Sequence, residues 1–119
     1  MLMTKRIYDA PSKDDGYRVL VDRLWPRGIS KERAALYRWA KEVSPSDALR
    51  REFGHEMKKF DWLKKAYIAE LNANPAAENF AAEIKTLLAK GDVTLLYGAR
   101  NEEANHALVL KDYVGKKIK

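Results

Sequence analysis

The sequence has no cysteine among its 119 residues, which excludes disulfides, thiolate catalysis and cysteine-based metal sites. Only two histidines are present, and no set of residues has metal-ligand spacing, so we expect neither a metal nor a cofactor. No apolar run approaches the roughly 18 residues of a membrane span, and the first residues lack the apolar core of a signal peptide. We therefore expect a cytoplasmic protein without membrane contact.

Glycine and proline are also sparse, with six and four residues, and they form no stretch that could serve as an interdomain linker. A single domain over 1–119 is expected, since this length suffices to bury one core. The Walker-type loop, the Gly-x-Gly-x-x-Gly fingerprint and the nucleophile elbow are all missing. The usual signatures of nucleotide-binding proteins and hydrolases are thus absent.

The net charge of +6 lies mainly in the first half of the chain. Residues 1–60 hold 14 lysines and arginines against 9 acidic residues, whereas residues 61–119 hold 9 against 8. Excess positive charge favours anionic partners, either phosphate-bearing small molecules or nucleic acid, and it also serves solubility. Charge alone leaves these three explanations open.

Two continuous apolar runs predict strands that are covered on both faces, at Val19–Arg23 and Val93–Tyr97. A shorter strand is predicted over Lys5–Tyr8. The segment Leu36–Val43 is ambiguous between strand and helix, and its alternation slightly favours a strand with one aromatic face. Helical spacing and capping residues predict a turn over Lys31–Ala35 capped by Ser30, a helix from the Ser44 cap to Gly54, one carrying Phe60, Leu63, Tyr67 and Leu71, one from Pro75 to Gly91, and a last one over 102–116.

Helices alternate with buried strands in this pattern, and connections of that length join parallel strands. The prediction is an α/β fold with a small, largely parallel sheet of about four strands and helices packed against it. Open parallel sheets bind ligands beyond the carboxyl ends of their strands. The predicted site residues after the first buried strand are Asp22, Arg23, Trp25, Arg27 and Gly28, and those after the second are Tyr97, Arg100, Asn105 and His106.

If the two buried strands are neighbours, these groups converge on one pocket. Arginine forks beside an aromatic wall suit a carboxylate or a phosphate, so the predicted ligand is an anionic small molecule. In an enzyme, Asp22 or His106 would be the proton carrier. The residues do not decide whether a reaction takes place.

Each of these residues also has a purely structural interpretation. Asp22 with Arg23 or Arg100 could form ion pairs that only pin the loop. Trp25, before a proline, is more typical of a plug at the end of the core than of a ligand contact. A lone helical histidine such as His106 is more often structural as well.

Two rival functions come from other classes. A nucleic-acid-binding module could use a basic helical surface, but Phe60, Leu63 and Tyr67 look like core where such a module would expose polar groups. A protein-interaction domain could dock a partner through the Trp25 loop. The sequence does not indicate an oligomeric state. The basic surface would comprise Arg50, Arg51, Lys58, Lys59, Lys64 and Lys65.

Negative charge at the start of the last helix bears on where an anion would bind. Glu102 and Glu103 are expected in the first turn of that helix, where they complement the positive end of its dipole. A phosphate at this helix end is therefore not favoured. The loop that follows the first buried strand is the better anion candidate.

The stretch Asp15–Gly28, Asp-Gly-Tyr-Arg-Val-Leu-Val-Asp-Arg-Leu-Trp-Pro-Arg-Gly, resembles the signature of the YeaO-like family, domain of unknown function 488. Other blocks, such as Trp39–Ser46, resemble that family in order, so the resemblance covers nearly the whole chain. It implies a bacterial-type cytoplasmic α/β domain and no established activity. Longer relatives have a Cys-His-Arg motif where this chain has Asn105, His106 and Ala107, so only the histidine of that motif carries over.

Overall fold

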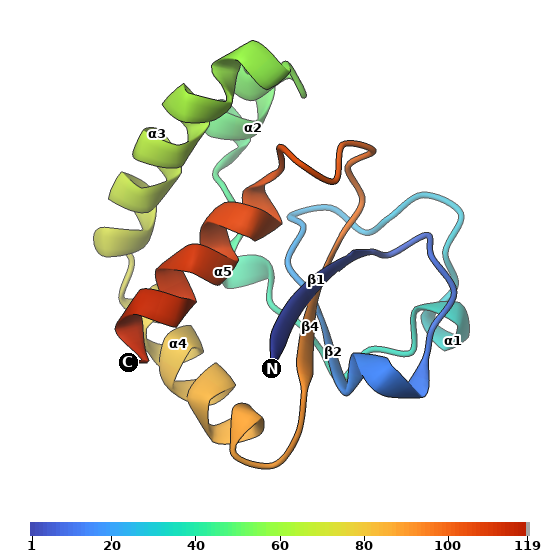
Figure 1. Ribbon diagram of the computed structural model, residues 1–119. Coiled ribbons are helices and arrows are strands. Elements are labelled where there is room, and N and C mark those ends of the chain that lie inside the picture. Colours follow the sequence, from blue (N-terminus) through green and yellow to red (C-terminus); the bar gives the residue numbers. More distant parts are fainter. Residues whose placement is uncertain (119) are drawn as a thin grey trace.

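A computed structural model describes residues 1–118 and contains one four-stranded sheet (Figure 1). All strand pairings are parallel, and the strand order is β1-β4-β2-β3. The predicted α/β class and the largely parallel sheet are therefore confirmed. The strands are β1 (Leu2–Arg6), β2 (Tyr17–Leu20), β3 (Arg38–Trp39) and β4 (Val93–Tyr97).

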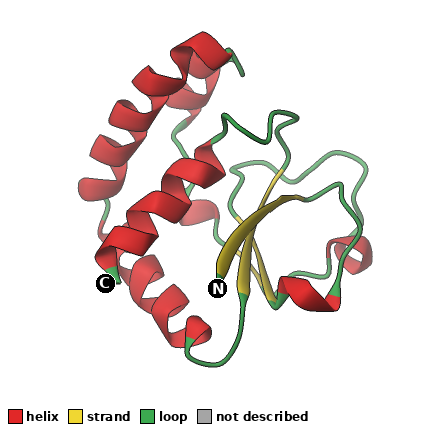
Figure 2. Ribbon diagram, viewed as in Figure 1, coloured by secondary structure: helices red, strands yellow, loops and turns green. Residues whose placement is uncertain are grey.

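Among residues 1–118, five α-helices connect and cover the strands (Figure 2). Helices α2 to α5 lie on one side of the sheet, and the short α1 lies on the other (Figure 1). None of the described helices is long and apolar enough to cross a membrane. The helices are α1 (Lys31–Ala34), α2 (Asp47–Phe53), α3 (Phe60–Asn72), α4 (Pro75–Leu88) and α5 (His106–Lys117), with 3-10 turns η1 (Lys13–Asp15), η2 (Lys41–Val43) and η3 (Met57–Lys59).

Capping residues set several helix ends where the sequence predicts them. Ser30 accepts a hydrogen bond from the Arg33 amide at the start of α1. Asn74 caps α4 directly before Pro75. Gly54 ends α2 in the left-handed conformation, with φ +54°. These local signals are strong enough to survive the tertiary context.

The start of α2 was predicted wrongly by two residues. Ser46, and not Ser44, accepts the hydrogen bond from the Leu49 amide, so the helix begins at Asp47. The Ser44 hydroxyl instead donates to the Lys41 carbonyl at 2.6 Å, which closes the preceding 3-10 turn. Two serines flank Pro45, and the tertiary structure selects the second as the cap.

The start of α5 was also predicted wrongly, because a helix from about residue 102 was expected. The Asn101 Oδ1 accepts hydrogen bonds from the amides of Glu103 and Ala104, which folds this segment into a turn. The helix then begins at His106. Glu102 and Glu103 are consequently not in its first turn, which has no acidic residue, so the dipole objection to an anion near this helix does not apply.

Strand limits differ from prediction by a few residues. Strand β1 covers Leu2–Arg6 instead of Lys5–Tyr8, because its pairing with β4 begins at Leu2. Strand β2 ends at Leu20, so Asp22 already lies in the loop. Of the ambiguous segment 36–43, only residues 38 and 39 pair as a strand, and a 3-10 turn follows.

Alternate strand residues enter two different cores. Val19 and Leu95 are buried in the large apolar core formed with α3, α4 and α5. Leu20 and Leu96 are buried on the opposite side, next to α1. This smaller core consists of Ile7, Leu20, Ala34 and Leu96, against which Trp25, Ile29, Leu36 and Trp39 pack.

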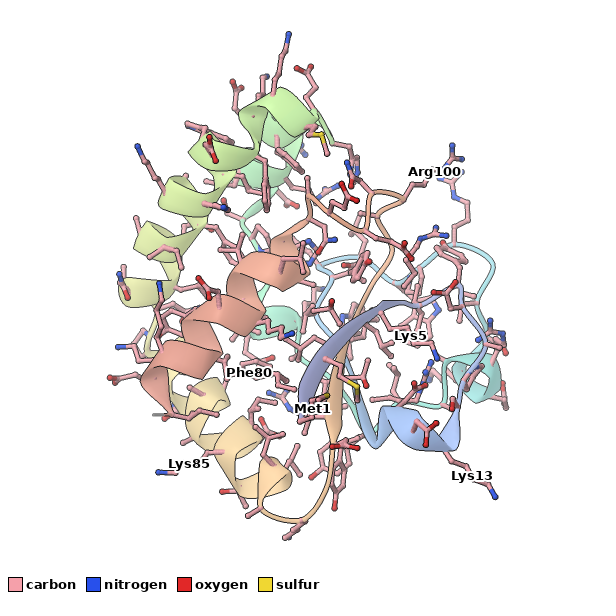
Figure 3. The ribbon with its side chains drawn as sticks, viewed as in Figure 1. Met1, Lys5, Lys13, Phe80, Lys85 and Arg100 are labelled. Carbon is pink, nitrogen blue, oxygen red and sulfur yellow. The ribbon has the colours of Figure 1, made fainter. Side chains whose placement is uncertain are left out.

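A buried ion pair lies on the α1 side of the sheet. Arg18 donates to Asp15 Oδ2 and, through Nε, to the Ala34 carbonyl at 3.0 Å. Lys5 reaches the same carboxylate from β1 at 3.0 Å, on the side of the strand that faces η1 (Figure 3). Burial raises the pKa of Asp15, but hydrogen bonds from the Ser12 amide, Lys5 and Arg18 outweigh burial, so the pKa is lowered overall. The pair therefore ties η1, β1, β2 and α1 together.

Candidate functional site

Strands β2 and β4 are neighbours, so their carboxyl ends lie side by side. Asp22 follows β2, and its Oδ2 accepts a hydrogen bond at 2.8 Å from the amide of Gly98, which follows β4. A Cβ at position 98 would come within 2.9 Å of that same oxygen, so glycine allows the two loops to approach this closely. The two strand ends meet, and Asp22 joins them.

His106 is the first residue of α5, and its ring faces the other oxygen of the Asp22 carboxylate. Its Nε2 lies 3.1 Å from Asp22 Oδ1 and 3.0 Å from the Val21 carbonyl oxygen. An ionised carboxylate and a carbonyl only accept hydrogen bonds, so Nε2 carries a proton. The hydrogen bond goes to the carbonyl, and the carboxylate adds electrostatic attraction. The Tyr67 ring packs edge-on against the imidazole at 6.3 Å between centroids, so His106 is held in one orientation.

Asn105 caps α5 and is only 1% exposed. Its Oδ1 accepts from the Leu108 amide, and its Nδ2 donates to the Asn101 carbonyl at 2.8 Å. Both ends of the amide are therefore bonded within the protein. The main effect of Asn105 is to fix the position of the next residue, His106.

A cavity of about 480 Å³ opens between these strand ends and the corner formed by α2 and α3. Its lining comes from three stretches of chain that are far apart in sequence: the loop after β2, the α2–α3 region, and the loop after β4. Five of the nine predicted site residues line it. These are Asp22, Arg23, Arg100, Asn105 and His106.

Positive charge dominates the lining of the cavity. Three arginines, Arg23, Arg50 and Arg100, line it together with both histidines of the chain. Asp22 is the only carboxylate among the described lining residues, and its charge is compensated locally by His106 and the Gly98 amide. Within residues 1–118, no three histidine, aspartate or glutamate side chains are grouped so as to hold a metal ion.

The three arginines differ in how far they are committed to the protein. Arg23 donates through Nε to the Pro45 carbonyl at 2.9 Å and so holds the segment before α2. Arg50 pairs at 3.1 Å with Asp47, an exposed carboxylate whose pKa is lowered mainly by that hydrogen bond. Arg100 is exposed at the edge of the fold and has no ion-pair partner among residues 1–118 (Figure 3). Arg100 is therefore the freest cation of the three.

Trp25 lies outside the cavity lining, although it was predicted to bind substrate. Its ring packs edge-on against Trp39 at 5.4 Å in the small core. Its Nε1 donates to the Ile29 carbonyl at 2.6 Å. The structure therefore gives Trp25 the packing position that its sequence context also allowed.

Three further predicted residues lie away from the cavity. Arg27 and Gly28 are exposed at the end of the Trp25 loop, where Tyr8 donates from its hydroxyl to the Arg27 carbonyl at 3.0 Å. Tyr97 is buried in the main core, and burial raises the pKa of its hydroxyl. The packing of Trp25 carries the chain away from the cavity after residue 24. The substrate-binding roles of these residues stay predictions.

Sequence reasoning missed the part of the lining that comes from α2 and α3. Arg50, Phe53 and Leu63 line the cavity from these helices. His55 follows Gly54 and itself has a left-handed backbone, with φ +61°, which is uncommon for a residue other than glycine. Two successive left-handed residues turn the chain back and bring His55 to the cavity. A Gly-His pair at a helix end is the one local signal that could have indicated it.

The basic surface considered for nucleic acid is partly neutralised. Lys58 pairs with Glu56 at 3.8 Å, and Lys59 pairs with Glu52 at 3.6 Å. Lys64 lies over the Phe60 ring, 5.0 Å from its centroid. The inner face of α3 is buried in the main core and is not available to enter a groove.

Comparison with known proteins places the chain among uncharacterised relatives. A family model described as "Inactive DUF488-N3 subclade" matches residues 1–119. The uncharacterized protein YeaO of Escherichia coli K12 is 43% identical over 95% of this chain and 96% of its own length. The uncharacterized protein Rv3073c of Mycobacterium tuberculosis is 38% identical over 88% of this chain and 86% of its own length. No solved structure gives a significant match.

Proposed function

The chain belongs to the YeaO-like DUF488 family, and on that premise we propose that it binds an anionic small molecule in the cavity between β2, β4 and α2. The observation that carries this proposal is the lining itself. Three arginines and both histidines meet there, with Asp22 as the only carboxylate among the described lining residues. Guanidinium groups hold phosphates and carboxylates through paired hydrogen bonds, so the lining suits such a ligand.

Two of the arginines are available to a ligand. Arg100 has no ion-pair partner among residues 1–118, so all its donors can turn to an anion. Arg50 is paired with Asp47 at the surface, where ion pairs contribute little to stability. Arg50 can therefore exchange Asp47 for an anionic ligand at small cost. Arg23 supplies charge to the site, since its Nε is already bonded to the Pro45 carbonyl.

The ligand is bound without being transformed. The matching family model is described as inactive, which favours binding over turnover. Asp22 and His106 bond to each other and to the loop backbone at Gly98 and Val21, so they serve as a joint between strand ends. Asn105 occupies the position where longer relatives resemble one another in having a cysteine, and its amide is committed to capping α5.

Calorimetric titration of inorganic phosphate, pyrophosphate and citrate into wild type, Arg100→Gln and Arg27→Gln tests the proposal. Both variants lose one exposed positive charge, but only Arg100 lines the cavity. Arg100→Gln weakens binding by about tenfold or more, because a hydrogen bond to a charged group contributes roughly 1.5–3 kcal/mol. Arg27→Gln changes the affinity by less than about twofold, through long-range charge alone.

Equal losses in the two variants would place the ligand at the Trp25 loop and would contradict a site in the cavity. The absence of any heat or thermal shift with all three anions at low salt would overturn the proposed function. A nucleic-acid-binding role is the alternative outcome. It would appear as binding of generic duplex DNA that falls steeply with salt and weakens in a Lys64→Ala, Lys65→Ala variant.

A further inference from the structure

One wall of the cavity is apolar. Phe53 at the end of α2 and Leu63 in α3 line it, and Pro45 extends it toward Arg23. The Phe53 ring is backed by the Phe60 ring, whose centroid lies 6.4 Å away. Phe53 and Leu63 belong to the main hydrophobic core. The wall is therefore a rigid surface, with only its outer side open to the cavity.

Apolar and aromatic groups continue from this wall to the rim of the cavity. Leu24 lines the rim and is 57% exposed, although its side chain is apolar. The His55 ring lies 6.2 Å from the Phe53 ring, and the left-handed backbone of His55 is strained for a residue with a side chain. Such strain clusters at functional positions, because the surrounding structure has to hold it in place. The rim thus offers a flat heteroaromatic ring and an aliphatic side chain.

We infer that the ligand is an aromatic anion, whose flat ring packs on the apolar wall while its phosphate or carboxylate faces Arg50 and Arg100. This inference rests on the proposed function and adds the ligand class. A small inorganic anion would contact the arginines and leave the wall in water. A ring removes the wall from water, which is the favourable term for apolar surface. The cavity volume of about 480 Å³ lies within the range of small-molecule sites.

Ring and charge can be separated with four probes in calorimetric titrations: methyl phosphate, phenyl phosphate, phenol and benzoate. Methyl and phenyl phosphate share the anionic group and differ in the ring. Phenyl phosphate is expected to bind about tenfold tighter than methyl phosphate, as expected for burial of roughly one aromatic ring. Phenol is expected to bind at least about tenfold more weakly than phenyl phosphate, since it lacks the charge. Benzoate compared with phenyl phosphate distinguishes a carboxylate from a phosphate ligand.

Leu24→Ala shortens the apolar rim without touching the core. It is expected to lower the ratio of phenyl to methyl phosphate affinity by about threefold and to leave methyl phosphate binding unchanged. Met57→Ala is the matched control, because Met57 is similarly exposed, at 54%, and does not line the cavity. It is expected to leave the ratio unchanged. Arg100→Gln is expected to weaken both phosphates by the same factor.

The outcomes separate this inference from the proposed function. Equal affinity for methyl and phenyl phosphate would overturn the aromatic ligand class and leave the anion site standing. A ratio that falls equally in Leu24→Ala and Met57→Ala would also overturn it, since the ring would then bind elsewhere. Binding of phenol as tight as that of phenyl phosphate, or no binding of any probe, would overturn the proposed function as well.

Discussion

Side chains of β4 point alternately toward α3, α4 and α5 and toward α1, and the two sides bury different chemistry. On the helical side, Leu95 lies among apolar residues only. On the α1 side, Leu20 and Leu96 share their face of the sheet with Arg18 and Thr94, which are buried and polar. The same strands are therefore held by apolar burial on one side and by directional contacts on the other.

This difference shows which contacts decide the course of the loops. Apolar burial is non-directional, so the helical side tolerates small changes of shape. The α1 side depends on partners at fixed positions: Arg18 bonds to Asp15 and the Ala34 carbonyl, and the Thr94 hydroxyl donates to the Asp15 carbonyl at 2.7 Å. The loops before β2 and around α1 are positioned by these bonds. The helical side contributes most of the buried apolar surface.

Loss of the buried carboxylate is expected to have the largest effect on stability. Asp15→Ala leaves Arg18 buried without its ionic partner and lowers the free energy of unfolding by about 3 kcal/mol. That value is at the low end for a broken buried pair, because the network meets solvent at Lys5. Urea denaturation measures it. The double variant with Arg18→Met should regain most of the loss, and no recovery would contradict a role of the ion pair.

Removal of a single donor on the same side is expected to have a smaller effect. Trp25→Phe deletes the hydrogen bond to the Ile29 carbonyl and shrinks the contact with Trp39, which lowers the free energy of unfolding by about 1–2 kcal/mol. Affinity for anions in calorimetry should stay unchanged, because Trp25 does not line the cavity. A marked loss of affinity would return Trp25 to the site.

A trimmed methyl group on the helical side is expected to cost about 1 kcal/mol. Ile84→Val in α4 leaves a small gap in the main core, and apolar neighbours can partly close it. Urea denaturation measures the loss, and amide chemical shifts of η1 and α1 should stay at their wild-type positions. Shifts in those loops would show that the two sides are mechanically coupled and would weaken the contrast drawn here.

Acid is expected to act on the α1 side through Asp15. Because its pKa is lowered in the folded state, Asp15 contributes stability that is full above the ordinary value of 3.8 and is lost as pH falls through the lower folded pKa. Near neutral pH this titration has no effect. Unfolding free energies of wild type and Asp15→Asn between about pH 2 and pH 6 should converge in acid. A constant difference over that range would contradict the lowered pKa.

Elements with strong periodicity could be predicted from the sequence. Helix α3 repeats Phe60, Leu63, Tyr67 and Leu71 on one face, and β4 is a continuous apolar run. The neighbourhood of β2 and β4 could only be stated as a condition. Strand order depends on how the helices pack, and no local pattern encodes it.

Helix starts near clustered capping residues could not be predicted. Asn101 and Asn105 can each satisfy free backbone amides, and in the structure the first forms a turn while the second caps α5. Ser44 and Ser46 present the same choice at α2. Both options are locally similar in energy, and tertiary contacts select between them.

About half of the candidate site could be predicted, and the rest depended on tertiary packing. Asp22 and His106 follow from their places at the two strand ends. Arg50 and His55 could not be expected, because the α2–α3 corner reaches the strand ends only after the helices pack. Trp25 was included for its closeness in sequence to Asp22, but its packing in the small core turns the loop away.

Strand β4 is both a central strand of the sheet and the last strand along the chain. Strands β1 and β2 both pair with it, whereas β2 and β3 share only a two-residue pairing. Pairing between distant segments is slow, because the entropy of loop closure is lost before the contacts form. During synthesis on the ribosome, β1 therefore stays unpaired until β4 emerges. The sheet is completed at the end of translation and does not grow strand by strand.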